Sequence, residues 1–526
     1  MSRVKVLDCT LRDGGYINEW MFGDNNIDYV LSSLVESDVD IVEIGFLSNQ
    51  TEANKDSSKF TSFEAMDERI KESYATTMFV CMINYGEFDI KEVPFRDETK
   101  IDGIRLAFHK KDVTGALEFA KGVIGKGFKL FLQPMVAANY NDHEYLDLIR
   151  EANSLNPYAF YIVDSFGQMT KQDVIRYFFM VEYNLDRHIY VGYHSHNNLQ
   201  LAYSNAQALL GLDSYRELII DSSIYGMGRG AGNLNTELFM GYLNELKLGN
   251  YNISPLLNVI DYVLKPIYEI KYWGYSLPHY LSAINGCHPN YASYLADRGT
   301  LTVKAIDDVL SLIASEKKIN FDKSYIRNLY YEYQEKLEAQ ISNVDQLNQL
   351  ISEKNVLLYF PGLSIVEEED KIRGFVDSHE NLLKIAVNFL PQNHESDLVF
   401  FSNLRRYEKA NNANNEKIIL TSNIPNNKNV KFKVSYRELL NEVEGVQDNA
   451  GMMLIKLLIK HNVKGIYLAG LDGYSLDREL NFSDQSMSIA QTSERLKLIN
   501  EGMNKLIKEF RNQTHLTFIT KSKHIY

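Results

Sequence analysis

Cysteine is scarce in this chain of 526 residues. The three cysteines, Cys9, Cys81 and Cys287, stand far apart in the sequence and form no CxxC pair. This spacing indicates neither a disulfide framework nor a thiolate zinc site, and it fits a protein of the reducing cytoplasm.

An excess of positive charge and long apolar runs are also lacking. The chain has 55 Lys and Arg against 69 Asp and Glu, a formal net charge of −14. Nucleic-acid binding needs clustered Lys and Arg to neutralise phosphates, so this acidic balance argues against a nucleic-acid partner. No apolar run approaches the roughly 18 residues that span a bilayer, and the N-terminus does not read as a signal peptide. We therefore expect an unprocessed cytoplasmic protein that does not bind a membrane.

Short apolar runs alternate with amphipathic stretches from residue 1 to about 240, with the βα period of a parallel sheet. Several runs are almost continuously apolar, as in strands that are covered on both faces. Eight strands are expected: Val4–Cys9, Ile41–Phe46, Thr77–Ile83, Asp102–Ala107, Lys129–Met135, Phe160–Asp164, Tyr190–His194 and Leu218–Ile224. Eight βα units in this length favour a TIM barrel over an open sheet.

The rest of the chain predicts a helical segment and a second α/β domain. Apolar residues recur at helical spacing from Leu256 to Ile267, and a segment rich in Glu, Lys and Gln follows. Five further strands and one helix are expected: Val356–Phe360, Leu383–Phe389, Leu398–Ser402, Lys417–Thr421 and Gly465–Ala469, with the helix at Gly451–His461. The predicted α/β architecture is thus a TIM-barrel domain at 1–250, a helical extension and linker at 251–350, and a Rossmann-like open α/β domain at 351–526.

Polar residues gather where the barrel strands are expected to end, which is where barrel enzymes build their sites. Asp13 lies in the run LDCTLRDGG, His194 and His196 begin HSHNN, and Asn233 ends GMGRGAGN. Alternate residues of a strand point to the same face, so both histidines can reach one ion. We predict a divalent metal bound by Asp13, His194 and His196, with the amide of Asn233 available as a further ligand.

Each motif also has a plainer interpretation. A His-x-His pair can be structural, and the glycine run Gly226–Gly232 can be a tight turn that permits close backbone approach. That run also has the composition of a phosphate-binding loop, but it lacks the Lys and Ser/Thr of a P-loop. The order of the motifs, at the ends of strands one, seven and eight, favours the metal site. A bound ion would leave open positions for a 2-oxo acid, and Arg12 could stabilise the enolate that forms when a neighbouring bond breaks.

These motifs, together with Tyr161–Ser165, resemble those of the metal-dependent aldolase and condensing-enzyme family, which includes 4-hydroxy-2-oxovalerate aldolase, HMG-CoA lyase and isopropylmalate synthase. The resemblance covers roughly residues 4 to 245 and is greatest to the aldolases. It implies Mn²⁺ or Mg²⁺ on the predicted ligands, stabilisation of an enolate by Arg12, and binding of a substrate carboxylate by Ser165. The implied reaction is cleavage of a 4-hydroxy-2-oxo acid into a pyruvate-type enolate and an aldehyde, and the barrel class suggests a homodimer.

One departure concerns proton transfer. The aldolases have a histidine where this chain has Tyr16, and a tyrosine is a poor base at neutral pH unless its surroundings lower its pKa. The base is therefore Tyr16 in a tuned site or another residue, such as His288 or Tyr291. These two lie in a segment that corresponds to the helical tail of the aldolases, where an ordinary loop is the plainer interpretation. Arg105 and Gln133 are candidate substrate ligands, with packing inside the barrel as the alternative.

Two rival functions remain open. Acyl-CoA condensation of the Claisen type is one, although Gly15 and Tyr16 differ from the residues typical of those enzymes. The other is a bifunctional protein whose C-terminal domain binds a nucleotide or nucleotide sugar. Pro361–Ser364 and the loop within Gly465–Tyr474 follow expected strands, where open sheets place ligands. That domain has no GxGxxG fingerprint, so a fused dehydrogenase is not indicated.

Overall fold

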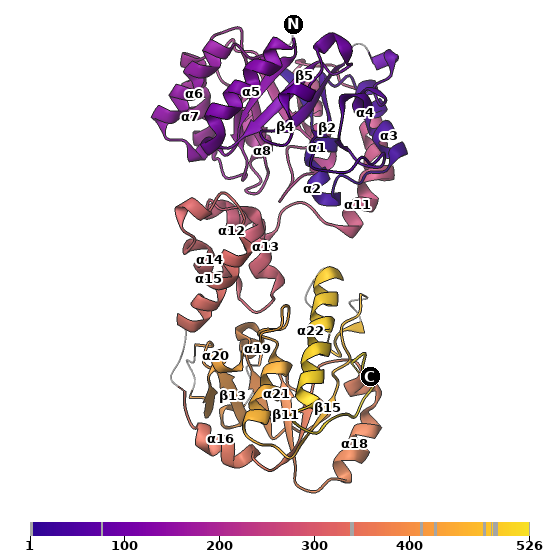
Figure 1. The fold of residues 1–526 in the computed structure, drawn as a ribbon, viewed down its shortest axis with the longest axis vertical. Helices are drawn as coiled ribbons and strands as arrows, with labels where there is room; N and C mark the ends of the chain where they lie inside the picture. The colour runs from indigo at the N-terminus through magenta and orange to yellow at the C-terminus, as the bar shows by residue number, and fades with distance from the viewer. Residues whose placement is uncertain are drawn as a thin grey trace. The chain divides into compact units, whose positions relative to one another are not determined.

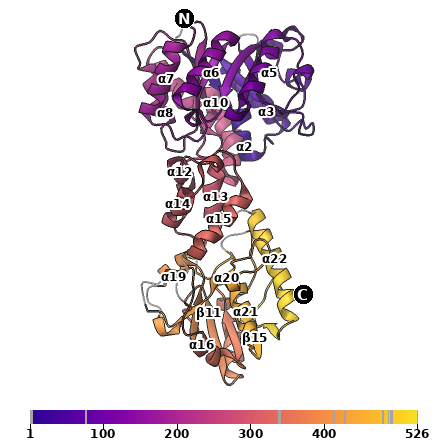
Figure 2. The same ribbon diagram turned by 60° about the vertical axis from the view of Figure 1, so that its left-hand side comes forward.

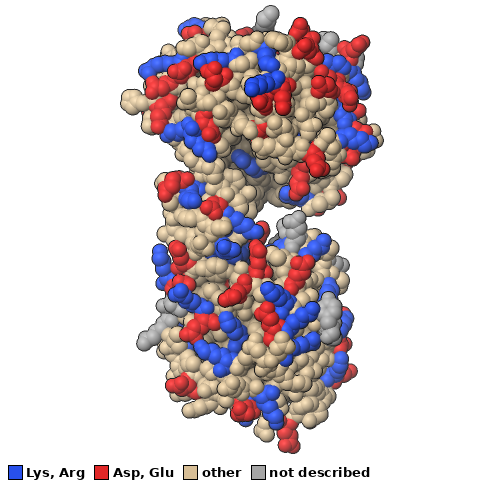
Figure 3. All heavy atoms as spheres, in the orientation of Figure 1, with Lys and Arg blue, Asp and Glu red and all other residues tan. Residues whose placement is uncertain are grey.

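The computed structural model describes residues 4–74, 77–336, 341–410, 414–425, 429–476, 480–484, 487 and 493–524. The chain forms two compact units: Met1–Asn290 with Ser315–Phe321, and Tyr291–Ala314 with Asp322–Tyr526. Within the described ranges no helix is both long and apolar enough to cross a membrane. On the face drawn in Figure 3, acidic and basic side chains are interspersed on both units.

The first unit is built on a closed barrel of eight parallel strands (Figure 1). They are β1 (Val4–Asp8), β2 (Ile41–Leu47), β4 (Met78–Asn84), β5 (Gly103–Phe108), β6 (Lys129–Pro134), β7 (Ala159–Asp164), β8 (Tyr190–Ser195) and β9 (Leu218–Ser222). The barrel closes because β1 pairs with both β2 and β9. A short strand, β3 (Lys59–Phe60), pairs beside β2. The predicted TIM barrel is confirmed, and each predicted strand end lies within two residues of the observed one.

Helices cover the outside of the barrel, and alternate strand residues face its two sides. In β1, Val4 and Val6 pack with the helices, whereas Leu7 packs with Ile41 and Tyr161 in a separate interior cluster. The covering helices are α3 (Asp24–Glu36), α4 (Phe63–Asp67), α5 (Val113–Gly125), α6 (Asp142–Leu155), α7 (Lys171–Asn184), α8 (Ala202–Leu210) and α9 (Thr236–Glu245), and two short helices, α1 (Thr10–Asp13) and α2 (Gly15–Asn18), follow β1. Short 3₁₀ turns are η1 (Glu72–Tyr74), η2 (Ile90–Glu92), η3 (Arg96–Glu98), η4 (Lys110–Asp112), η5 (Ala137–Asn139), η6 (Ile224–Gly226), η8 (Ser315–Lys317) and η9 (Asn415–Lys417).

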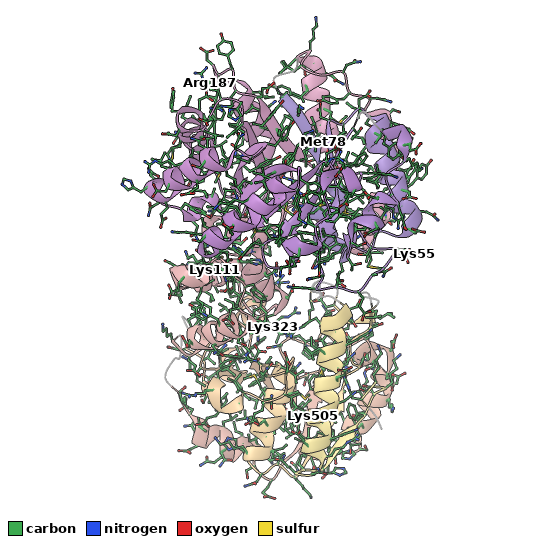
Figure 4. All side chains as sticks on the ribbon, turned by 45° about the horizontal axis from the view of Figure 1, so that its top comes forward. Lys55, Met78, Lys111, Arg187, Lys323 and Lys505 are labelled. Atoms are coloured by element: carbon green, nitrogen blue, oxygen red, sulfur yellow. The ribbon has the colours of Figure 1, made fainter. Side chains whose placement is uncertain are left out.

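The side-chain view agrees with this layering. Charged side chains such as Lys55, Lys111 and Arg187, labelled in Figure 4, are exposed on the first unit. Met78, also labelled there, begins β4 and is partly buried. Lys505, on a helix of the second unit, is exposed as well.

The segment 251–350, expected as an extension and linker, is divided between the two units. Its first helices are α10 (Ser254–Val259), the π-helical turn η7 (Ile260–Leu264), α11 (Lys265–Ile270) and α12 (Leu277–Ile284), and the later ones are α13 (Pro289–Asp297), α14 (Val303–Ser311), α15 (Lys323–Lys336) and α16 (Val344–Ile351). Leu256, Val259 and Leu264 are fully buried in the barrel's outer core. The apolar spacing from Leu256 to Ile267 thus corresponds to helices, as predicted. It does not specify which hydrophobic core each helix covers.

The second unit contains an open sheet of seven parallel strands. They are β10 (Asn355–Tyr359), β11 (Leu382–Val387), β12 (Leu398–Phe401), β13 (Ile418–Thr421), β14 (Phe432–Val434), β15 (Gly465–Ala469) and β16 (Leu516–Phe518), in the order β14-β13-β12-β11-β10-β15-β16. The five predicted strands are confirmed. Strands β14 and β16 were not predicted, because three residues are too few to display an alternation.

Helices lie on both faces of this sheet (Figure 2). Val356 and Leu358 of β10 pack with α16, α21 (Ala450–Lys460) and α22 (Ser493–Arg511). Leu357 and Tyr359 face the other way, toward α17 (Ser364–Glu367), α18 (Glu369–Asp377) and α19 (Leu404–Lys409), and α20 (Tyr436–Leu439) precedes α21. The chain leaves β10 for β11 on one side and returns to β15 on the other. The topological switch point therefore lies at the carboxyl ends of β10 and β15.

Candidate metal centre

Three predicted metal ligands come together at the carboxyl end of the barrel. Asp13 ends α1, which directly follows β1, and His194 and His196 lie in and just after β8. One ligand atom from each residue lies within 4.8 Å of the other two, and all three side chains are buried. This spacing suits a single ion.

Backbone contacts hold the motifs in place. The N–H of Asp13 donates to the carbonyl of Cys9 at 2.8 Å, and the N–H of Cys9 donates to Ser222 of β9 at 2.8 Å. His196 and Asn233 form an isolated antiparallel bridge. A Cβ on Gly228 would lie 2.7 Å from Asp13 Oδ2, so only glycine permits this approach. The glycine run thus acts through close packing, as its plainer interpretation predicts.

The side chains fit a cation. Asn233 Nδ2 donates to Asp13 Oδ2 at 2.6 Å. Among the described residues, Asn233 Oδ1 and His196 Nδ1 are buried and have no hydrogen-bond partner. Buried polar atoms without partners are costly, and a bound ion would offset such a cost. Asn233 therefore lies where the sequence predicted it, with its oxygen available as a ligand.

Electrostatics keep these groups in their metal-binding forms. Burial lowers the pKa of His196 to about 3, so its imidazole is neutral at physiological pH. Burial by itself raises the pKa of Asp13, but the charge of Arg12, helped by the hydrogen bond from Asn233, outweighs that effect and holds the pKa well below its usual value. A carboxylate and neutral imidazoles are the forms that bind divalent metals.

A buried chain of ion pairs links Arg12 to His194. Arg12 donates from Nη1 to Asp13 at 2.5 Å and from Nε to Glu43 at 2.8 Å. Arg105 Nη1 donates to the same Glu43 oxygen at 2.7 Å, and its Nη2 donates to Asp221. His194 Nδ1 lies 3.0 Å from the Asp221 carboxylate. A carboxylate in this position orients a metal-binding imidazole.

This arrangement places Arg105 and Gln133 in the barrel interior, where they are 0% and 2% exposed. In the amide orientation that satisfies both groups, Gln133 accepts a hydrogen bond from Arg105 Nη2 at 2.8 Å. Tyr161 donates to Asp221 at 3.0 Å beside them. These contacts match the packing alternative for Arg105 and Gln133. The sequence-based prediction gave no ligand or catalytic role to Glu43, Asp221 or Tyr161. A lone charge within an apolar strand was the available signal for Glu43 and Asp221.

A cavity of about 280 Å³ in the first unit contains other predicted residues. Tyr16, Ser165 and His288 line it together with Arg229, which the sequence analysis did not single out. Ser165 Oγ accepts a hydrogen bond from the N–H of Val136 at 2.9 Å. Arg229 donates to the carbonyl of Ser165 at 2.9 Å, and its guanidinium lies 5.5 Å from the Tyr16 ring. The cavity therefore combines a cation, a phenol and an imidazole.

The two proton-transfer candidates in this cavity differ electrostatically. Burial raises the pKa of Tyr16, and the charge of Arg229 offsets only part of that effect. Tyr16 thus stays protonated and lacks the lowered pKa that a tyrosine base requires. Burial, Arg229 and His109 lower the pKa of His288 to about 3. Its Nδ1 accepts from the N–H of Asn290 at 3.2 Å, so the neutral ring carries its hydrogen on Nε2.

Tyr291 belongs to the second unit. Its side chain is 0% exposed, and its hydroxyl accepts a hydrogen bond from the N–H of Asp322 at 3.1 Å. It is not among the described residues that line the cavity with Tyr16 and His288. Its catalytic role stays a prediction.

The first unit is thus a TIM barrel with a candidate divalent-metal centre. Residues 3–263 match the HMGL-like family model, and this part of the chain is an HMGL-like domain, as the resemblance implied. The chain is 24% identical over 273 residues to a 4-hydroxy-2-oxovalerate aldolase of Geobacillus genomosp. 3, covering 51% of this chain and 78% of that protein. It is 24% identical over 350 residues to the aldolase of that name from Pelotomaculum thermopropionicum, covering 63% and 96%.

Solved structures with this fold are also similar. The N-terminal domain of a Bacteroides vulgatus protein with a provisional aldolase assignment is 28% identical, with a TM-score of 0.48, over 57% of this chain and 98% of that one. The HMG-CoA lyase of Brucella melitensis is 15% identical, with a TM-score of 0.40, over 49% and 96%.

The ion-pair chain predicts a large stability loss for Arg105→Met. The substitution leaves Glu43 and Asp221 without their shared cation, and breaking a buried pair costs about 3–5 kcal/mol. Both tryptophans, Trp20 and Trp273, belong to the first unit, so urea unfolding followed by tryptophan fluorescence reports on the barrel.

The matched control is Arg150→Met, since the Arg150 side chain is 72% exposed and its pair with Asp147 lies on the surface. We expect this variant to unfold within about 1 kcal/mol of the parent. Equal stability of the two variants would contradict a structural role for Arg105.

Proposed function

We propose that the protein is a divalent-metal-dependent carbon–carbon lyase that cleaves a 4-hydroxy-2-oxo acid through a pyruvate-type enolate. The observation that carries this proposal is the buried cluster of Asp13, His194 and His196, with Arg12 paired to Asp13. The HMGL-like domain and the relatives named as aldolases support it. Mn²⁺ and Mg²⁺ are the ions proposed.

Asp13, His194 and His196 would hold the ion, and Asn233 Oδ1 offers a further ligand atom. When bound, such an ion supplies positive charge that polarises a 2-oxo group and stabilises an enolate oxygen. Arg12 is fixed by two carboxylates and 6% exposed at its side chain. A preorganised guanidinium of this kind stabilises developing negative charge without having to reorganise during the reaction.

We assign proton transfer to His288 rather than Tyr16. For His288 to take the proton of the substrate's 4-hydroxyl group as the carbon–carbon bond breaks, an anionic substrate has to offset the charge of Arg229 and raise the pKa of the ring from about 3, and Nδ1 has to release the Asn290 N–H. Tyr16, which stays protonated, can donate a hydrogen bond to the same oxygen. Ser165, at the wall of the cavity, is proposed to contact the substrate carboxylate. Tyr291 remains an alternative proton-transfer residue.

The reaction is tested by pyruvate release from a panel of 4-hydroxy-2-oxo acids in the presence of Mn²⁺ or Mg²⁺. We expect release to require the metal and to fall by at least about 100-fold in His194→Ala, because a ligand to the ion is lost. His143→Ala, which changes an exposed histidine on α6, serves as the control. If no member of the panel is cleaved and acyl-CoA thioesters are turned over instead, condensation is the correct function.

The proton-transfer assignment predicts different effects for two substitutions. His288→Gln should lower kcat by about 100-fold, the usual scale of general acid–base catalysis, whereas Tyr16→Phe should lower it by about 10-fold. His279→Gln, at another histidine that burial keeps largely neutral, is the matched control. A larger loss in Tyr16→Phe than in His288→Gln would show that the tyrosine transfers the proton.

A further inference from the structure

A second candidate site lies at the switch point of the open sheet. A cavity of about 190 Å³ is lined by loops that follow β10, β11, β12 and β15, by the first turn of α21, and by a segment around Arg298. All of these residues belong to the second unit. Open α/β sheets bind ligands at this place because the two neighbouring loops diverge there.

Two buried polar atoms on the wall of this cavity have no partner. Ser402 is 5% exposed, and its Oγ makes no hydrogen bond with any described residue. The Nε of Arg298 is likewise unpaired among the described residues, although Nη2 of the same side chain donates to Tyr294 at 2.7 Å. Buried donors and acceptors are normally paired, so these atoms indicate a polar ligand rather than a packing void.

The charges on the wall favour an anion. Of the two acidic residues that line the cavity, Asp448 accepts a hydrogen bond from Tyr330 at 2.6 Å and pairs with Arg298, and Asp472 accepts from the N–H of Ser364 at 2.8 Å. Arg406 makes no direct salt bridge with a described residue, although the charge of Asp484 in the neighbouring cavity acts on it. It donates to the carbonyl of Met487 at 2.5 Å, and it lies 5.6 Å from the Phe482 ring. A partly buried guanidinium that no carboxylate contacts directly is a recognition group for oxyanions.

The start of α21 adds to this positive potential. Ala450 and Gly451, its first two residues, line the same cavity. The N–H groups of a first helical turn have no acceptor within the helix, and the helix dipole favours an anion beside them. The side chain of Asn449, the N-cap residue, accepts a hydrogen bond from the N–H of Met452 at 3.1 Å, so that N–H group is already satisfied.

Arg406 also borders a larger neighbouring cavity. This second cavity, of about 410 Å³, shares Asn388, Arg406 and Met487 with the first. Ile365, Leu390 and Pro391 give its wall an apolar character, and Lys409 and Asp484 add one charge of each sign. Together the two cavities reach the volume of small-molecule sites, roughly 300–1,000 Å³.

We propose that the second unit binds an organic phosphate, with the phosphate group between Arg406 and the start of α21 and the organic part extending into the neighbouring cavity. Nucleotides and sugar phosphates are members of this class. The proposal rests on contacts within the second unit and does not depend on the function proposed for the barrel.

Isothermal titration calorimetry on the full chain, without added metal, tests it. The probes are uridine diphosphate, cytidine monophosphate, adenosine diphosphate, glucose 6-phosphate, inorganic phosphate and, as a carboxylate, citrate. We expect at least one organic phosphate to bind saturably and more tightly than inorganic phosphate. Arg406→Gln should raise its Kd by about 10- to 100-fold, because a charge-assisted hydrogen bond is lost.

Arg405→Gln provides the matched control, since it removes the same charge from an exposed neighbour on α19. It should leave the Kd within about twofold of the parent value, as an exposed, unengaged charge contributes little. Circular dichroism and thermal unfolding confirm that both variants fold. The proposal is overturned if no organic phosphate binds below about 10 mM, if citrate alone binds, or if both variants bind as the parent does.

Discussion

The candidate metal centre depends on one buried cation, Arg105. Its side chain is 0% exposed and bridges Glu43 of β2 and Asp221 of β9 across the barrel interior. Each of those carboxylates also contacts a residue of the candidate site, because Glu43 binds Arg12 and Asp221 lies against His194. With Asp13, the network contains three carboxylates and two guanidinium groups, an excess of one negative charge. A divalent cation would offset that excess, so the interior ion pairs and the candidate metal site form a single electrostatic unit.

The sequence was sufficient to predict the barrel and the cluster of Asp13, His194 and His196. It was not sufficient to predict the ion pairs that surround this cluster, and the reasons are physical. Strands covered on both faces are almost continuously apolar, and residues at their carboxyl ends must converge, so Asp13 and His194 could be placed together. Arg105 is separated by 62 residues from Glu43 and by 116 from Asp221. The closure and stagger of a barrel determine which strands face one another across its interior. Local sequence patterns contain no information on either. The only signal in the sequence for Glu43, Arg105 and Asp221 is that each is an isolated charge in an apolar strand: IVEIGFL, GIRLAF and LIIDS.

In the second unit, the sequence predicted the parallel sheet but not the side chains at its switch point. The predicted ligand loops after β10 and β15 do line the cavity there. Ser402 and Arg406 come from the other side of the switch, in and after the loop that follows β12, and no periodicity distinguishes Arg406 from its exposed neighbour Arg405. Helical amphipathicity has the same limit, since it specifies that α10 and α13 bury a face but not which core receives it.

The two units apply one geometric rule to opposite charges. Parallel strands bring chemically active side chains to their carboxyl ends in both the barrel and the open sheet. In the barrel, every guanidinium of the network is matched by a carboxylate and the excess charge is negative, which favours a cation. At the switch point of the open sheet, Asp448 and Asp472 already have hydrogen-bond partners and Arg406 makes no direct salt bridge with a described residue, which favours an anion. Because low-dielectric surroundings strengthen such charges, we infer the ligand proposed for each unit from the sign of its excess charge more than from the shape of either cavity.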